Sequence, residues 1–147
     1  MVLWLLLSAS AQAVGESRCT LSAKEVRLNV QISDMASAEG NVTITIYPDD
    51  ANQFLAKKGK IARQRVPTVM PVTTACFAVP APGLYAIAVY HDANDDHDFN
   101  RSFIGMPKEG FGFSRNPKTA LGLPDFSEVR FEAHAGNNPV EIKLNYR

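Results

Sequence analysis

The sequence predicts an all-β protein, an antiparallel immunoglobulin-like or transthyretin-like β-sandwich of about seven strands with one long loop excursion. Two observations support this fold class. Apolar and polar residues alternate with a period of two along most of the chain, and turn residues separate the alternating runs. Only residues 52–58 have a helical pattern. A closed barrel is the alternative architecture, and the 147 residues fit a single domain.

Six segments are predicted as strands. In residues 25–33, apolar side chains such as Val26 and Leu28 alternate with polar ones, as expected for a half-buried strand. Similar patterning predicts strands over residues 41–47, 72–79, 84–90, 126–133 and 140–146, and residues 63–66 add a seventh. Glu39-Gly40 and Gly136-Asn137-Asn138 are predicted to form hairpin turns between strands.

The N-terminus resembles a secretory signal. Residues 2–7 are apolar, and Ala11-Gln12-Ala13 has the small-x-small form that signal peptidase cleaves. We therefore expect a signal peptide over residues 1–13, an N-terminal segment over 14–24 and one domain over 25–147. No Lys or Arg precedes the apolar run, so either the α-amino group supplies the positive charge or the true start lies upstream. A buried N-terminal strand or helix is the alternative.

Export places the protein in the periplasm or outside the cell. No transmembrane span is predicted, because the apolar run is far shorter than the roughly 20 residues a span needs. The chain has two cysteines, Cys19 and Cys76. In an exported protein the simplest expectation is that such a pair forms a disulfide. Such a bridge would contribute about 4 kcal/mol in the chain-entropy model. Free buried thiols are the alternative, and the close spacing of a redox-active pair is absent.

The charge balance argues against nucleic-acid binding. Fifteen basic and fifteen acidic residues give a formal net charge of zero, without the basic excess of nucleic-acid binders. Positive charge is concentrated locally, at Lys57, Lys58, Lys60, Arg63 and Arg65. We interpret this basic stretch as a solvated face. The alternative is contact with an anionic partner, such as lipid headgroups, polysaccharide or the acidic loop described next.

A long excursion over residues 91–122 begins with a candidate calcium loop. Oxygen-bearing side chains occupy alternate positions, at Asp92, Asn94, Asp96, Asp98 and Asn100. Calcium takes six to eight oxygen ligands, and a curled backbone with an oxygen at every second position supplies several of them. No cofactor other than calcium is predicted.

The loop departs from the EF-hand pattern. His97 stands where the sharp turn normally has glycine, Phe103 stands where the bidentate Glu belongs, and no helix pair flanks the loop. Glu109 is the nearest candidate for the closing carboxylate. We expect binding on the order of 10⁻⁴–10⁻³ M. The alternatives are a solvated or Lys/Arg-paired acidic turn, and a transition-metal site that uses His91 and His97.

Residues 105–114 follow, with three glycines among large apolar groups. One interpretation is a ligand lip formed by Glu109, Phe111 and Phe113, in which the glycines let another molecule approach the backbone. The other is a loop folded over the end of the sandwich and pinned there by the two phenylalanines.

Residues 83–92, then Asn94 and Asp96, then residues 103–114 together resemble the signature of the bacterial domain-of-unknown-function family 2141. The resemblance covers about residues 25–146 and implies a small exported protein of unassigned activity. The family usually has Gly at the position of His97 and Asp at the position of Asn100, and both differences weaken the calcium interpretation. The strand before the loop is also similar to transthyretin-like and carboxypeptidase-regulatory modules, which is a likeness of fold only.

The leading hypothesis is a non-enzymatic exported module that binds a small ligand or an envelope component at the acidic-loop end. No catalytic residue is assigned, because no nucleophile elbow, phosphate loop or dinucleotide fingerprint is present. One alternative is an envelope-associated hydrolase whose pocket lies under Phe111 and Phe113 and is lined by His91 and carboxylates. Another is an accessory domain recruited to an envelope complex through the basic stretch.

Overall fold

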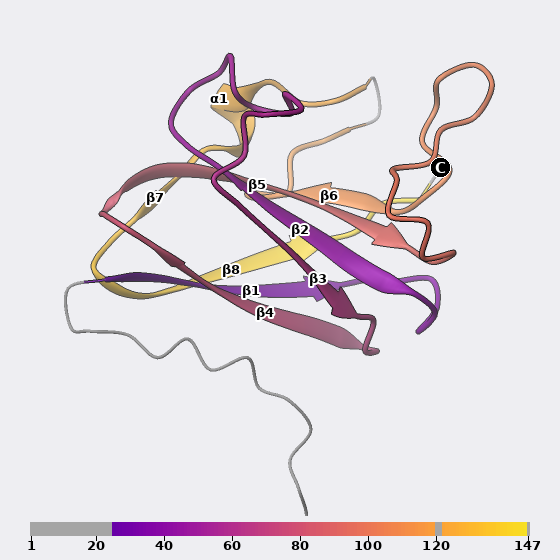
Figure 1. Cartoon of the computed structure of the whole chain (residues 1–147), viewed down its shortest axis with the longest axis horizontal. Helices are drawn as coiled ribbons and strands as arrows, with labels where there is room; N and C mark the ends of the chain where they lie inside the picture. The colour runs from indigo at the N-terminus through magenta and orange to yellow at the C-terminus, as the bar shows by residue number, and fades with distance from the viewer. Residues whose placement is uncertain (1–24, 120–121, 147) are drawn as a thin grey trace, which may run out of the picture.

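Two β-sheets pack face to face in the computed structural model, which describes residues 25–119 and 122–146 (Figure 1). This confirms the predicted all-β sandwich, and because the sheets stay open, the barrel alternative is wrong. The elements in chain order are β1 (Val26–Ser33), β2 (Asn41–Tyr47), β3 (Ala62–Pro67), β4 (Val72–Val79), β5 (Gly83–Asp92), β6 (Phe111–Phe113), α1 (Phe126–Val129), β7 (Phe131–Ala133) and β8 (Gly136–Lys143).

The two sheets differ in size and in strand direction. The smaller has the order β4-β1-β8, and the larger has the order β3-β2-β5-β6, with β7 paired to the start of β5. All pairs are antiparallel except β1 with β8, which run parallel from Val26 opposite Gly136 to Ser33 opposite Lys143. The expected antiparallel sandwich therefore contains one parallel pair, formed between segments more than 100 residues apart in sequence.

The main core lies between the two sheets. Residues of β1 that alternate in sequence, Val26, Leu28, Val30 and Ile32, are fully buried there together with Ile44 and other inward residues of the larger sheet. Burying each such side chain contributes about 1.5–3 kcal/mol. The period-two pattern thus identified the inward face of these strands correctly.

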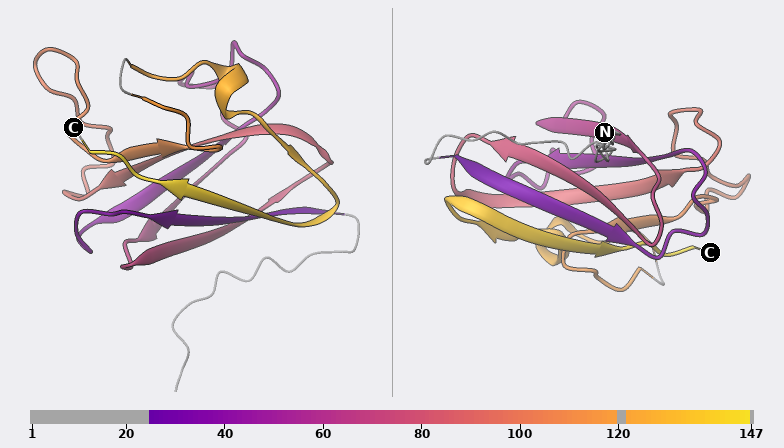
Figure 2. Two further views of the ribbon diagram at one scale, coloured as in Figure 1. Left: turned by 180° about the vertical axis from the view of Figure 1, so that it is seen from behind. Right: turned by 90° about the horizontal axis from the view of Figure 1, so that it is seen from below.

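A second, smaller apolar cluster covers the outer face of the larger sheet. Tyr47, Phe111 and Phe113 belong to it, and the ring of Phe54 packs on Tyr47 at 5.4 Å and on Phe126 at 5.8 Å between ring centroids. The turns that carry Phe54 and helix α1, which carries Phe126, lie over this face in Figure 1 and are seen from behind in Figure 2. Both faces of the larger sheet are therefore covered in this region.

The predicted strand over residues 126–133 is wrong in its first half. The Glu128 side chain reaches back to accept the backbone N–H of Asp125 at 2.8 Å, a contact that starts a helix. One turn of helix, α1, results, and only Phe131–Ala133 pairs as a strand. Residues 52–58 are also not helical. They form isolated turns, such as Gln53 N–H to the Asp50 carbonyl at 3.0 Å.

Both predicted hairpin turns are wrong, because neither segment joins two strands that pair with each other. Gly40 lies between β1 and β2, which do not pair. Gly136 and its two neighbours begin β8 itself. There the amide of Asn138 donates to the carbonyls of His134 at 2.7 Å and Arg27 at 3.2 Å, which fixes the start of the strand against β1.

The predicted signal peptide over residues 1–13, the segment over 14–24 and Cys19 lie outside the described residues. Cys76 lies on β4, and none of the cysteines described is a free thiol. The Cys19–Cys76 bridge stays a prediction. Within residues 25–119 and 122–146, no helix has the length and apolar character needed to cross a membrane.

Candidate functional site

Strand β5 delivers Asp92 to the start of the acidic loop. Asp92 is its last residue, is fully buried, and lies opposite Asn41 of β2. Gly40 packs against the same point so closely that a Cβ there would lie 2.0 Å from the Asp92 carbonyl oxygen. The start of the loop is therefore fixed by strand pairing on one side and by a glycine contact on the other.

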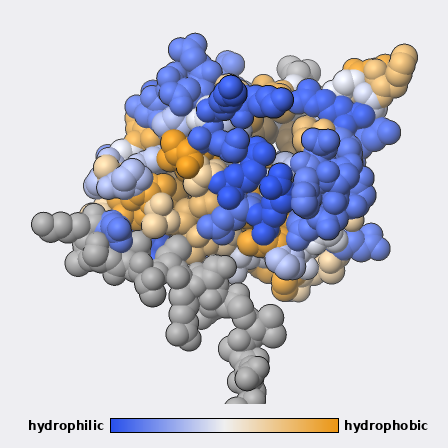
Figure 3. All heavy atoms as spheres, viewed as in Figure 1, coloured by the Kyte–Doolittle hydropathy of each residue, from blue (hydrophilic) through white to orange (hydrophobic). Residues whose placement is uncertain are grey.

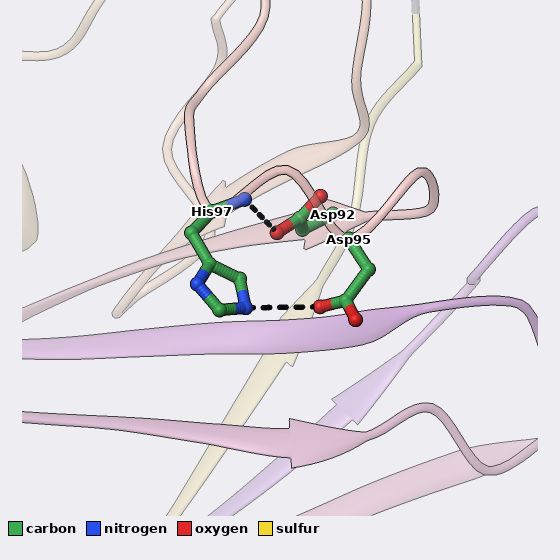
Figure 4. Close-up of side chains that lie close together, drawn as sticks. All are labelled: Asp92, Asp95 and His97. Carbon is green, nitrogen blue, oxygen red and sulfur yellow. Dashed lines mark hydrogen bonds and ion pairs between the residues drawn. The ribbon is translucent and has the colours of Figure 1, made fainter.

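The Asp92 carboxylate holds the loop in a tight curl. Its Oδ1 accepts the backbone N–H of Asp96 at 3.1 Å, and its Oδ2 accepts the N–H of His97 at 2.8 Å (Figure 4). A carboxylate has about four lone-pair sites, so each oxygen keeps acceptor capacity after these two bonds. The buried side chain can therefore both shape the loop and bind a cation.

Asp96 is the polar centre of the loop. Its Oδ1 accepts the N–H of Asp98 at 2.9 Å, and its Oδ2 accepts the side-chain amides of Asn94 and Asn100, both at 2.9 Å. The bond from Asn100, followed by the bond from the Asp98 backbone, holds the pKa of Asp96 below its usual range. Asp96 therefore stays ionised under mildly acidic conditions.

Glu109 joins this group from the far end of the excursion. Ligand atoms of Asp92, Asp96 and Glu109 all lie within 4.8 Å of one another. Glu109 Oε2 also accepts the backbone N–H of Asn100 at 3.0 Å. Partial burial raises the pKa of Glu109, and repulsion from Asp92, Asp96 and Asp98 raises it further. The structure thus brings the Glu109 carboxylate next to those of Asp92 and Asp96.

No lysine or arginine pairs with these carboxylates in the part of the chain that the structure describes. The ion pair formed there is between His97 Nε2 and Asp95 Oδ1 at 3.1 Å, and both side chains are more than half exposed (Figure 4). Asp95 also accepts the side-chain amide of Asn41. The Lys/Arg-paired turn considered from the sequence therefore has no pairing cation among residues 25–119 and 122–146, and the Asp98 side chain is exposed to solvent.

Two residues of the loop have left-handed backbone conformations. The φ angles are 56° at Asp95 and 65° at His97. A non-glycine residue in this region costs on the order of 1 kcal/mol. His97 is the position where a calcium loop normally has glycine, so the loop adopts the sharp turn even though this chain has a histidine there.

His91 is a packing residue rather than a ligand. It is almost fully buried, its Nδ1 lies 2.7 Å from the Tyr146 hydroxyl, and its Nε2 lies 2.7 Å from the Glu39 carbonyl oxygen. The carbonyl can only accept, so Nε2 carries the proton and Nδ1 accepts from Tyr146. Both ring nitrogens are therefore used, and the transition-metal site that joins His91 to His97 does not form.

The predicted ligand lip divides into two parts. Glu109 belongs to the carboxylate group, whereas Phe111 and Phe113 form the buried strand β6. The glycines between them face the protein's own chain: a Cβ at Gly110 would lie 2.3 Å from the Tyr146 ring, and one at Gly112 would lie 2.6 Å from the Lys143 carbonyl. These two glycines permit close packing on the C-terminal segment rather than approach of a ligand.

Sequence reasoning missed an exposed apolar hairpin tip. Residues 101–107 form a small hairpin, closed by the Ser102 N–H to the Met106 carbonyl at 2.6 Å. Phe103, Ile104 and Met106 are exposed on it. Figure 3 shows this tip projecting in orange at the upper right, above a hydrophilic surface over the same end of the sandwich.

Sequence reasoning also missed a pocket on the outer face of the larger sheet. Its volume is about 230 Å³, and Phe111 and Phe113 line it as the hydrolase alternative requires. Neither His91 nor any carboxylate is among the described residues that line it, so this pocket lacks the lining that the alternative requires. Of the basic stretch, only Arg63 reaches the pocket, while Lys57, Lys58 and Lys60 are exposed on the preceding turns.

Comparison with known proteins gives the family of the chain. No curated protein and no solved structure matches it. One family model matches residues 30–141, well over half of the chain, which includes the acidic loop, Glu109 and strand β6. The chain therefore belongs to the family described as "Uncharacterized protein conserved in bacteria (DUF2141)".

Proposed function

We propose that the protein is an exported, non-enzymatic binding module whose acidic loop is closed by a structural calcium ion. The observation that carries this proposal is the convergence of Asp92, Asp96 and Glu109 to within 4.8 Å, with no basic partner among the described residues. Like charges at this separation repel one another, and a divalent cation offsets that repulsion.

The donor set fits calcium in number and kind. Three carboxylates would be joined by the side-chain oxygens of Asn94 and Asn100 and by the backbone carbonyl of Asp98, which gives six oxygens. In this structure the side-chain N–H groups of Asn94 and Asn100 donate to Asp96 Oδ2, an oxygen that a bound cation would otherwise contact. Calcium binding would turn their oxygens inward. The expected affinity is weak, on the order of 10⁻⁴–10⁻³ M, because Phe103 stands where a calcium loop has its bidentate Glu.

The non-enzymatic part of the proposal is supported by His91. The side chain best suited to proton transfer near the loop is buried and hydrogen-bonded through both ring nitrogens. The other loop histidine, His97, points toward Asp95 at the surface and is not among the described residues that line the pocket with Phe111 and Phe113. A binding role therefore fits this end of the sandwich better than acid–base catalysis.

Calcium is expected to raise the thermal midpoint of the purified exported protein, and magnesium is not. A ligand that binds only the folded state stabilises by about 2.7 kcal/mol at a hundredfold excess over its Kd. Differential scanning calorimetry in calcium, magnesium and EDTA measures this. Asp96→Asn should remove the calcium-dependent rise. Asp49→Asn removes the same charge from an exposed position outside the loop and should leave the rise intact.

Three results would contradict the calcium site. These are no shift at several millimolar calcium, an equal shift with magnesium, or a loss of stability in Asp96→Asn that is the same in calcium and in EDTA. The last result would mean that Asp96 acts only through its hydrogen bonds to Asn94, Asp98 and Asn100.

Export and the Cys19–Cys76 disulfide are tested together by intact mass. The protein recovered from the periplasm or medium should begin at Val14 and should be lighter than its reduced form by two hydrogen atoms. Iodoacetamide should modify it only after reduction, because a disulfide leaves no thiolate to react. Retention of residues 1–13 would exclude cleavage at Ala13. Modification of both cysteines without reduction would exclude the bridge.

A further inference from the structure

The pocket on the outer face has a floor built by strand register. Thr45 of β2 lies opposite Arg63 of β3 on one side and Ala88 of β5 on the other, and Ala88 lies opposite Phe113 of β6. These four residues form one row across the sheet, and all four line the pocket. Adjacent strands β3, β2, β5 and β6 can be followed in Figure 1. Because the floor is a paired sheet, its side chains are held in a fixed arrangement.

Aromatic rings form one wall of the pocket. The ring centroids of Tyr90 and Phe99 are 5.5 Å apart, those of Phe99 and Phe111 are 6.0 Å apart, and those of Phe111 and Phe113 are 6.0 Å apart. Their planes are tilted or perpendicular, the arrangement in which aromatic rings attract one another. A planar ring in the pocket would meet both ring edges and ring faces.

Two guanidinium groups supply the charge of the pocket. The Nε–H of Arg63 donates to Thr45 Oγ1 at 2.9 Å, which orients that side chain over the floor. The guanidinium carbon of Arg101 lies 5.4 Å from the centroid of the Phe99 ring. No Asp or Glu is among the described residues that line the pocket. The polar character of the site is therefore cationic, and arginine is suited to planar oxyanions such as carboxylates.

We propose that this pocket binds a small organic anion that carries a carboxylate on an aromatic body of one or two rings. The volume of about 230 Å³ is below the range of pockets for drug-sized ligands, so the body is small. The aromatic wall takes the rings, and Arg63 and Arg101 take the carboxylate. This names the ligand class of the binding module and rests on that proposed function, but it does not require the calcium ion.

The test compares 1-naphthoate with its uncharged isostere 1-naphthamide by isothermal titration calorimetry of the exported protein. We expect the acid to bind at least about tenfold more tightly than the amide, because charge-assisted hydrogen bonds are roughly twice as strong as neutral ones. Arg63→Gln and Arg101→Gln should each weaken binding of the acid about tenfold and leave the amide unchanged. Both arginines are exposed, so these variants should fold normally.

The matched control is Arg65→Gln. Arg65 lies on the same strand and the same outward face as Arg63, one row along, opposite Thr43, and it does not line the pocket. Its loss should not change the affinity for the acid. All titrations are repeated in EDTA, so that failure of the calcium site leaves this comparison intact.

Any of three results would overturn the proposal. Equal affinity for acid and amide would show that the pocket does not select an anion. An equal loss of affinity in Arg65→Gln would show that diffuse surface charge, not the pocket, attracts the acid. No binding of either probe at millimolar concentration would show that the cavity does not accept an aromatic body.

Discussion

Glu109→Gln is expected to stabilise the calcium-free protein at pH 7 and to remove most of its stabilisation by calcium. The carboxyl is half-buried and faces Asp92, Asp96 and Asp98, so its charged form is disfavoured in the folded state. Glutamine removes that charge and can still accept the Asn100 N–H through its side-chain oxygen. In EDTA we expect a gain on the order of a few tenths of a kcal/mol, since solvent screens a partly exposed group. In calcium the closing ligand is lost, so most of the stabilisation, about 2.7 kcal/mol at a hundredfold excess, should disappear.

The stability gain of Glu109→Gln in EDTA should depend on pH, because the pKa of Glu109 is raised in the folded protein. A carboxyl that holds its proton more tightly in the folded state contributes stability below its ordinary pKa of 4.5, and this is lost as pH rises through the folded-state pKa. The calcium-free advantage of Glu109→Gln should therefore be present at pH 7 and vanish below pH 4.5. Thermal unfolding between pH 4 and 7 measures it. Glu141→Gln, on the exposed face of β8, is the control that should show neither effect.

The distinctive result is that Glu109→Gln raises the thermal midpoint in EDTA and lowers it in calcium, each relative to the unchanged protein. If Glu109→Gln lowers the midpoint equally in both conditions, Glu109 stabilises the loop through its bond to Asn100 alone. If it raises the midpoint equally in both, the three carboxylates repel one another but no cation relieves them.

Most strands were predictable because their alternation is local. β1 and β2 each place one apolar residue at every second position, and this period needs no knowledge of the partner strand. Which sheet a strand joins depends on contacts with residues that are far away in sequence. The parallel pairing of β1 with β8 depends on contacts such as that of Asn138 with Arg27, 111 residues away in sequence. Turn residues at 136–138 therefore indicated a hairpin that the fold does not contain.

The acidic loop was predictable for a similar reason, and the pocket was not. Asp92, Asn94 and Asp96 are close in sequence, so their spacing alone indicates a curled loop. Glu109 could be named only as the nearest carboxylate, and the pairing of β5 with β6 is what brings it back. The row from Arg63 to Phe113 joins residues of four strands, and no sequence pattern gives the order β3-β2-β5-β6.

Gly40→Ala is expected to lower the free energy of unfolding by about 3 kcal/mol or more, the sum of a left-handed backbone cost and an overpacking cost. The φ angle of Gly40 is 62°, and an added Cβ would lie 2.0 Å from the Asp92 carbonyl oxygen and 2.8 Å from two backbone atoms of Ala93. Backbone atoms in a paired strand cannot move aside as a flexible side chain does. The end of β5 must shift, so urea unfolding should show the loss, and the calcium-dependent rise in midpoint should weaken with it.

Gly105→Ala separates the two costs. Gly105 has a comparable φ angle of 82°, but no atom lies within 4 Å of the position its Cβ would take. We expect that variant to lose only about 1 kcal/mol, the conformational term alone, and to keep its response to calcium. If the two variants lost the same stability, the contact between Gly40 and Asp92 would contribute nothing. The larger loss of stability is expected at Gly40 because this glycine, in the β1–β2 connection, packs directly against the backbone of Asp92, the first carboxylate residue of the loop.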